Sequence, residues 1–201
     1  MRGHAHTIQE ELAGILAFVA AIWLVFLLEW VIGGTRLMAL GLVPRNLFGV
    51  LGILAMPFLH IGFGHLVSNT IPLFILLALL AGSQARSWEI VAEIVLLGGA
   101  LLWVFGRSAV HVGASGLVFG LVAFLIAAGF LEKRVIPLIV SVIVGFLYGT
   151  TLLWNVLPTV GSHVSWDGHL CGAVAGVACA YGLARNAKRP EAAAGAGQDC
   201  G

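Results

Sequence analysis

The stretch Gly113-Ala114-Ser115-Gly116-Leu117-Val118-Phe119-Gly120 places one serine among glycines at the predicted start of a membrane helix. Polar side chains inside a membrane are costly and tend to be functional. The residues beside Ser115 are as small as Gly and Ala, so we first consider a chemical role for its hydroxyl and only then a role in packing. The other candidate residues are those that could assist this serine.

The composition is that of a membrane protein. Of the 201 residues, 60% are hydrophobic and 9% are charged, whereas a soluble globular domain has about 25% charged residues. The net charge of +1 and the scattered Lys and Arg residues argue against a nucleic-acid partner. No apolar run carries the cleavage site of a removable signal peptide, so we expect the spans themselves to target the chain.

The apolar runs predict an all-α, polytopic membrane protein with six transmembrane helices, because about 20 apolar residues cross a bilayer. Between the first two spans, Gly33–Met56 mixes apolar and polar residues and is expected to be an interfacial loop. We expect residues 1–186 to form one transmembrane domain and residues 187–201 to form a disordered cytoplasmic tail. The predicted spans are Leu12–Ile32, His60–Leu80, Ser87–Phe105, Ser115–Phe130, Val135–Trp154 and His169–Ala184.

The basic residues of the loops predict the orientation. With both termini in the cytoplasm, seven of the ten Lys and Arg residues lie inside and three lie outside, as the positive-inside rule requires. We therefore expect a multi-pass protein of the cell membrane with both termini cytoplasmic. The second, fourth and sixth spans then start on the extracytoplasmic side, so that His65, Ser115 and His169 share one depth.

Ser115 becomes a nucleophile only if a base accepts its proton, and His169 is the candidate base. Stripes of small residues, which include Gly116 in the fourth span and Gly172 in the sixth, let two membrane helices approach closely. Each stripe alone is also typical of close-packed helices without chemistry. On a helix Asp167 would point away from His169, which favours a Ser–His dyad over a triad.

Acyl transfer also needs hydrogen-bond donors for the developing oxyanion. His65 and Asn69 are four residues apart, so they lie on one helix face and can point to the same position. The backbone N–H of Ser115, at a helix N-terminus, is a donor of the same kind. Phe119, one turn beyond Ser115, is expected to pack its ring against the imidazole of His169.

The motifs occur in a specific order: His60, His65 and Asn69 come first, Gly113-Ala114-Ser115-Gly116 follows, and Gly168-His169 begins the last span. This ordered set resembles the rhomboid family of intramembrane serine proteases from about residue 12 to residue 185. The resemblance implies a six-helix rhomboid-like bundle whose serine–histidine dyad cleaves peptide bonds within or beside transmembrane segments of other proteins. By motif position Ser115 is the nucleophile, His169 the base, and His65 and Asn69 the oxyanion donors.

Two departures from the family pattern are visible. The aromatic residue four positions after the serine, often Tyr in the family, is Phe119, which keeps the stacking role and lacks the hydroxyl. The Trp-Arg dipeptide that many members carry in the first loop is missing from Gly33–Met56.

His60 is expected to tether that loop or a backbone group, and His111, in a loop, is expected to be solvated. The residues expected to support the dyad are Gly113, Gly116, Phe119, His60 and Gly172.

Other readings of the same residues predict different chemistry. His60 and His65 are five residues apart and no HExxH motif occurs, so neither a metal nor another cofactor is expected. The alternative function is a rhomboid-like pseudoprotease that binds membrane-protein clients without cleavage, whose signature would be loss of Ser115 or His169. A small transporter would need charged residues in paired broken helices, and none are found. The expected partners are transmembrane protein substrates and the lipid bilayer, with the oligomeric state left open.

Overall fold

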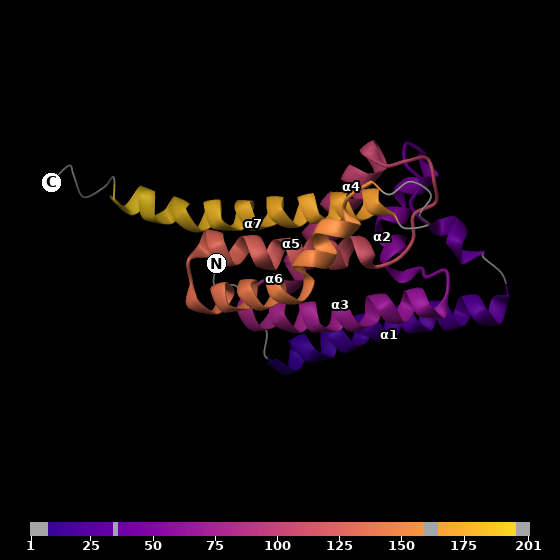
Figure 1. Cartoon of the computed structure of the whole chain (residues 1–201), viewed down its shortest axis with the longest axis horizontal. Helices are drawn as coiled ribbons and strands as arrows, with labels where there is room; N and C mark the ends of the chain where they lie inside the picture. Colours follow the sequence, from indigo (N-terminus) through magenta and orange to yellow (C-terminus); the bar gives the residue numbers. More distant parts are fainter. Residues whose placement is uncertain (1–7, 34–35, 159–164, 196–201) are drawn as a thin grey trace.

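Each long apolar run forms a helix in the computed structural model (Figure 1), which describes residues 8–33, 36–158 and 165–195, with residues 188–195 by backbone alone. The described residues contain no β-strand, which confirms the predicted all-α fold. The elements are α1 (Ile8–Ile32), η1 (Leu37–Leu40), η2 (Phe48–Val50), α2 (Gly52–Ala55), η3 (Met56–Phe58), α3 (Phe63–Ser83), α4 (Ser87–Phe105), α5 (Ser115–Glu132), α6 (Val135–Asn155) and α7 (Trp166–Gly195).

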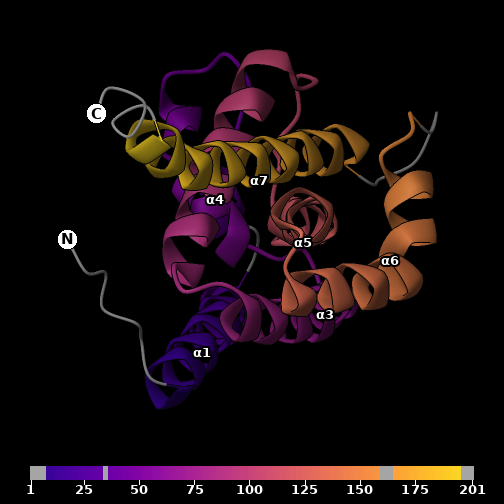
Figure 2. The same cartoon turned by 90° about the vertical axis from the view of Figure 1, so that its left-hand side faces the viewer.

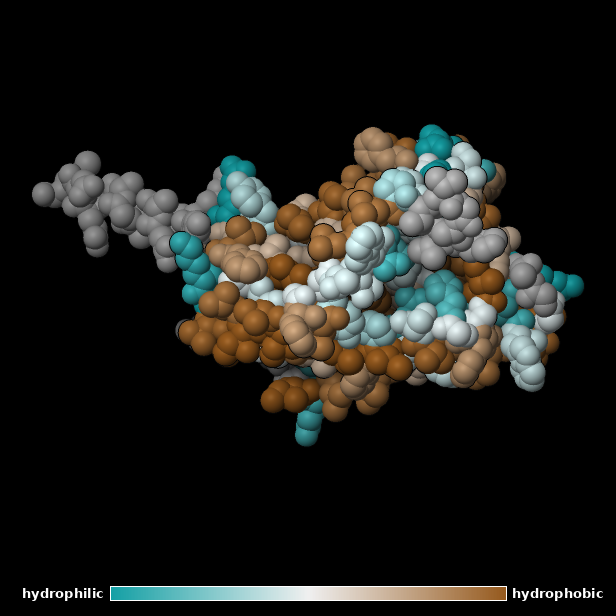
Figure 3. All heavy atoms as spheres, viewed as in Figure 1, coloured by the Kyte–Doolittle hydropathy of each residue, from teal (hydrophilic) through white to brown (hydrophobic). Residues whose placement is uncertain are grey.

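Among the described helices, α1, α3, α4, α5 and α6 are long and apolar enough to cross a membrane. Apolar side chains dominate the face of the bundle that Figure 3 shows. The chain is therefore a multi-pass membrane protein. The sixth predicted span lies in α7, which falls outside this group of helices because its glycines, Asp167 and His169 dilute its apolar content.

The central helix of the bundle is α5. Viewed end-on in Figure 2, it is surrounded by α3, α4, α6 and α7, whereas α1 lies at the edge beside α3. Every residue from Leu117 to Leu125 is buried. A helix at a surface buries only one face, so continuous burial means that α5 is enclosed on all sides. Ser115, its first residue, therefore lies at one end of an enclosed helix.

The helices α5 and α7 touch backbone to backbone because glycines face each other. A methyl group added at Gly172 would lie 2.0 Å from the carbonyl oxygen of Gly116, and one added at Gly176 would lie 2.0 Å from that of Gly120. Both distances are far below van der Waals contact, so no larger residue fits at Gly172 or Gly176. The close approach predicted from the glycine stripes is present, and it brings the start of α7 beside the start of α5.

The segment between α1 and α3 is a series of short helical turns with an apolar outer surface. Leu47, Phe48, Leu51 and Leu54 are all exposed. Such a surface suits a segment that lies in the membrane interface, as expected for this loop. Its regular turns were not predicted, because they are too short to show a hydrophobic period.

Arg45 fastens this first loop to the end of α4. Its guanidinium donates to the carbonyl oxygens of Val104 at 3.1 Å and Gly106 at 2.8 Å, which belong to the unpaired carbonyls at a helix end. The backbone N–H of Arg45 donates to the carbonyl oxygen of Trp103. The indole N–H of Trp103 in turn donates to the carbonyl of Asn46 at 2.9 Å. The first loop is thus held at the end of the bundle where α5 begins.

The last helix continues past the domain boundary expected at residue 186. It is helical to Gly195, so residues 187–195 of the expected disordered tail are helical, and residues 196–201 lie outside the described part of the chain. Most of residues 187–195 are Ala, Lys, Arg or Glu, which are strong helix formers.

Substituting Gly176 by Ala tests the contact between α5 and α7. The added methyl group meets the carbonyl of Gly120 and forces the helices apart, at a cost of about 1–3 kcal/mol. We expect a lower melting temperature in detergent. Gly182→Ala is the matched control in the same helix, because nothing lies within 4 Å of a methyl group there and Ala favours a helix over Gly by about 1 kcal/mol. Equal melting temperatures for both variants would contradict the close contact.

Candidate active site

The polar residues singled out in the sequence gather at the end of the bundle where α3, α5 and α7 begin (Figure 1). His65 and Asn69 lie in the first two turns of α3, Ser115 is the first residue of α5, and His169 lies in the first turn of α7. Successive helices run in opposite directions, so every second helix starts at the same end. This topology brings together residues that are far apart in sequence.

The imidazole of His169 is positioned by the ring of Phe119 and by the carbonyl group of Asn155. It stacks on Phe119 with ring centroids 4.0 Å apart and an interplanar angle of 5°, so the predicted stacking is present. Its Nδ1 lies 3.1 Å from the carbonyl oxygen of Asn155, at the end of α6. A carbonyl only accepts hydrogen bonds, so Nδ1 carries the proton and Nε2 keeps a free lone pair. This is the tautomer that a general base requires.

Ser115 and Phe119 are four residues apart and therefore occupy one face of α5. Because Phe119 stacks on His169, this face is the one turned toward the start of α7. Ser115 is half-buried, whereas His169 is 6% exposed. The Ser115 hydroxyl makes no hydrogen bond to any residue that the structure describes, and catalytic hydrogen bonds often tighten only when substrate binds.

His65 and Asn69 reach the turn that precedes Ser115. A methyl group added at Gly113 would lie 2.6 Å from the His65 ring and 3.8 Å from the Asn69 amide nitrogen. Gly113 also has a φ of 112°, a conformation that other residues rarely adopt, and its N–H donates to the carbonyl of Met56 at 2.9 Å. Glycine is thus required at position 113 both by the backbone conformation and by the space that His65 occupies.

His60 lies buried next to His65. It is 2% exposed, and the two ring centroids are 5.1 Å apart. Its Nδ1 is 3.4 Å from the carbonyl oxygen of Phe58, so it contacts a backbone group as expected. Burial, followed by the neighbouring His65, lowers the pKa of His60 to about 4 and keeps its ring neutral at pH 7. Among the described residues, no group of three His, Cys, Asp or Glu side chains is arranged to hold a metal ion.

A polar cluster that the sequence did not reveal joins the loop before α5 to the start of α7. Asp167 accepts hydrogen bonds from the backbone N–H of Arg107 at 2.9 Å and from its guanidinium at 3.1 Å. The hydroxyl of Ser165 donates to Asp167 at 3.1 Å, and His111 Nδ1 lies 2.8 Å from that hydroxyl oxygen. Asp167 is therefore engaged with Arg107 and Ser165. The only signal in the sequence was one acidic and one basic residue in two loops on the same side.

The expectation that His111 is solvated is wrong, because it is 3% exposed. Its backbone pairs with that of Leu42 through two hydrogen bonds of 2.8 and 3.0 Å. These bonds hold the loop before α5 against the first loop. Sequence reasoning treated each loop separately and did not consider that two loops might cover each other. His163, which the sequence likewise places in a loop and which was also expected to be solvated, lies outside the described residues.

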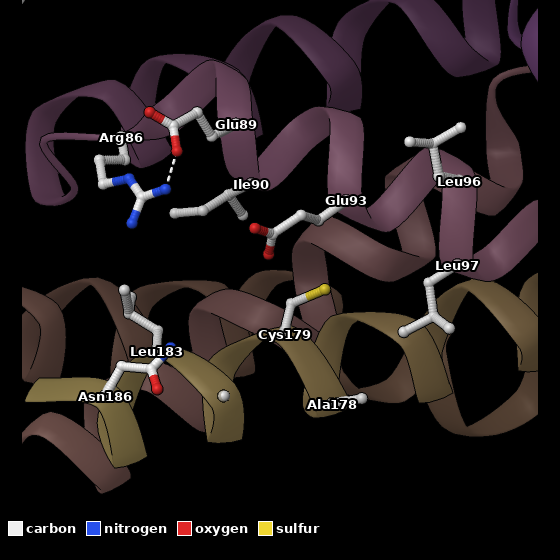
Figure 4. A pocket seen from close by; sticks show the side chains of 11 residues that line it. Arg86, Glu89, Ile90, Glu93, Leu96, Leu97, Ala178, Cys179, Leu183 and Asn186 are labelled. Carbon is white, nitrogen blue, oxygen red and sulfur yellow. Dashed lines mark hydrogen bonds and ion pairs between the residues drawn. The ribbon is translucent and has the colours of Figure 1, made fainter. Parts of the chain in front are cut away.

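A separate pocket lies at the opposite end of the bundle, between α4 and α7 (Figure 4). The pocket has a volume of about 410 Å³, and the residues that line it include Arg86, Glu89, Glu93 and Cys179. Arg86 forms an ion pair with Glu89. No histidine or serine lines it. Glu93 thus faces a pocket that it shares with Arg86 and Glu89, and charged residues in membrane helices usually face such cavities instead of lipid.

The sequence matches the family model of the Rhomboid domain over residues 47–186, a range that contains all the candidate site residues. An uncharacterized protein of Mycobacterium tuberculosis and one of Mycobacterium bovis are each 39% identical over 197 residues, which cover 93% of this chain and 81% of theirs. An uncharacterized protein of Mycobacterium leprae is 37% identical over 201 residues, which cover 92% of this chain and 76% of its own.

The lowered pKa of His60 predicts a pH-dependent stability. Between pH 6.5, where an exposed histidine titrates, and pH 4, the unfolded chain binds a proton that buried His60 does not. Stability should therefore be complete above pH 6.5 and fall by about 3 kcal/mol as the pH is lowered toward 4. Melting temperatures measured across this range should fall less for His60→Asn than for the wild type. The same pH dependence in both proteins would contradict a neutral, buried His60.

Proposed function

The chain belongs to the rhomboid family, and from that premise we propose that it is an intramembrane serine endopeptidase that cleaves transmembrane segments of other membrane proteins. The observation that supports this proposal is the position of the His169 imidazole. The ring stacks on Phe119, and its Nδ1 donates a hydrogen bond to the carbonyl of Asn155. A neutral imidazole with a free Nε2, next to a helix that starts with serine, is what a general base and its nucleophile need.

In the proposed mechanism, Ser115 attacks the scissile carbonyl while Nε2 of His169 takes its proton. The imidazolium donates that proton to the leaving amine, and water then hydrolyses the acyl-enzyme. Two contacts favour the charged imidazolium: the hydrogen bond from Nδ1 to Asn155, and the face of Phe119, where a cation gains about 0.5–2 kcal/mol. Phe119 therefore orients the base and stabilises its protonated form.

The oxyanion donors in this mechanism are His65, Asn69 and the backbone N–H of Ser115. One hydrogen of the Asn69 amide is used in a bond of 2.9 Å to the carbonyl of His65. A primary amide has two N–H donors, so one remains for the oxyanion. The nearness of the His65 ring and the Asn69 amide to Gly113 supports a position beside the reacting serine. Loss of one such donor typically lowers kcat by about 10²–10³.

Substrate is proposed to enter laterally past α6. The buried residues of α6 all lie in its first half, the last of them being Val144. Its second half, which ends at Asn155 beside His169, is exposed or half-buried, and nothing lies within 4 Å of a methyl group built at Gly145 or Gly149. The part of α6 nearest to the candidate site is thus the part held least firmly by its neighbours.

The orientation is also a proposal. The excess of Lys and Arg in loops at the end away from Ser115 supports both termini in the cytoplasm and the active site toward the extracytoplasmic side. The catalytic water then arrives from outside the cell, and the products of cleavage separate across the membrane.

Loss of the dyad tests the proposed activity directly. Purified protein in detergent should react with a fluorophosphonate probe and cleave a model transmembrane substrate, whereas Ser115→Ala should do neither. His169→Ala should lower kcat by at least about 10³. Labelling that persists in Ser115→Ala would refute the nucleophile, and cleavage that persists in His169→Ala would refute the base. A wild-type protein that binds the substrate without labelling or cleavage would be the pseudoprotease.

The stacking role of Phe119 has its own test. Phe119→Leu removes the flat ring behind the imidazole, so we expect kcat to fall about tenfold with little change in KM, since an orienting contact acts mainly in the transition state. Phe119→Tyr keeps the ring and should restore kcat. The control is Phe130→Leu at the far end of the same helix, where the side chain is 65% exposed. Equal kcat values for both leucine variants would remove Phe119 from the mechanism.

A further inference from the structure

A cavity of about 600 Å³ lies between the end of α1 and the start of α3, beside the candidate active site. Most of its lining is apolar, and four of the lining side chains are exposed on the outer surface of the bundle: Leu27, Trp30, Ile61 and Phe63. In a membrane protein this surface faces lipid, so the mouth of the cavity opens toward the bilayer. Two polar side chains, Glu29 and His60, also line the cavity.

Both polar side chains carry a buried acceptor that has no hydrogen-bond partner among the described residues. Oε2 of Glu29 accepts the N–H of Leu37 at 2.9 Å, whereas Oε1 is unpaired. Nδ1 of His60 faces the carbonyl of Phe58 and so carries the ring proton, which leaves Nε2 as an unpaired lone pair. Glu29 and His60 are 8% and 2% exposed, and unpaired polar atoms at such burial are rare and costly.

The chemistry of these two atoms defines the missing partner. Both Oε1 of Glu29 and Nε2 of His60 are acceptors, so each needs a hydrogen-bond donor, and a group with several N–H bonds could serve both. The ion pairs among the described residues do not include Glu29, so a cationic donor would meet no competing partner there. The lowered pKa of His60 keeps its ring neutral, so it does not repel a cation at pH 7. A primary ammonium group meets all of these requirements.

We propose that this cavity binds the head group of phosphatidylethanolamine, with its ammonium hydrogen-bonded to Glu29 and His60 and its acyl chains at the exposed apolar rim. The rim favours a lipid over a free amine, because burying apolar surface is the main driving force for such binding and a free amine has none. Trp30 at the mouth suits the interfacial depth where lipid head groups lie. A choline head group has no N–H and cannot pair with either acceptor.

The cavity lies next to the proposed catalytic groups without including them. The ring of His60 lines it and lies 5.1 Å from the ring of His65. If the proposed protease function holds, a bound ammonium will alter the surroundings of one oxyanion donor. Binding itself does not depend on that function, so it is tested without cleavage.

The test uses the full-length Ser115→Ala protein in detergent, titrated with short-chain lipids that share the same acyl chains, with bound lipid counted by native mass spectrometry. The lipids are phosphatidylethanolamine, its N-methyl and N,N-dimethyl derivatives, and phosphatidylcholine. Affinity should fall at least tenfold along this series, first at the N,N-dimethyl derivative, which has one N–H for two acceptors, and again at phosphatidylcholine, which has none. Soluble ethanolamine should not bind at the same concentrations. Equal affinity for the first and last lipids, or equally tight binding of ethanolamine, would overturn the proposal.

Substitutions then assign the preference to this cavity. Glu29→Gln keeps the shape of the side chain, removes its charge and should abolish the preference for phosphatidylethanolamine. Glu93→Gln, in the pocket at the other end of the bundle, should keep it. If Glu29→Gln does not fold, Ile61→Ser takes its place, because it removes apolar surface from the exposed rim of the cavity and should weaken binding of phosphatidylethanolamine. A preference that survives Glu29→Gln would overturn the site, whereas an inactive wild type that keeps the preference would refute only the protease.

Discussion

The backbone contact between α5 and α7 is the constraint on which the rest of the structure depends. Gly172 and Gly176 leave no room for a side chain against the carbonyls of α5, so the two helices meet backbone to backbone. In a bilayer, close packing of small residues drives helix association because lipid is as apolar as the helices themselves. At this separation Phe119 of one helix stacks on His169 of the other. The glycines therefore set the position of the candidate base as well as the fold.

The helices and this contact could be predicted from the sequence because each rests on a local pattern. Spans follow from apolar length, and the contact follows from glycines at helical spacing. The pairing of Leu42 with His111, and of Arg107 with Asp167, could not be predicted, because each depends on which loops become neighbours once the bundle forms. The argument from five-residue spacing treated His60 as helical. It precedes α3, and so its ring can lie beside that of His65.

The candidate site also has features that the sequence predicts and features that it does not. The types of residue and their order along the chain named the candidate serine, base and donors, because the proposed chemistry restricts which side chains can serve. The features that hold these groups in place are backbone atoms, such as the carbonyls of Asn155 and Met56, and any residue type supplies a carbonyl. A sequence motif cannot record them. The acceptors of Glu29 and His60 were missed for a related reason, since an unpaired atom becomes visible only when all its neighbours are known.

The hydrogen bond from His169 to Asn155 has a consequence for the order of events in catalysis. Asn155 is the last residue of α6, the helix whose loosely held half borders the proposed entry route. Displacing this half to admit a substrate would withdraw the carbonyl that fixes the proton on Nδ1, and the base would lose its defined tautomer. Admission and chemistry would then exclude each other in time. Under the proposed function, the base would be ready only after the helix has returned, and membrane proteins that pass by would be protected from accidental cleavage.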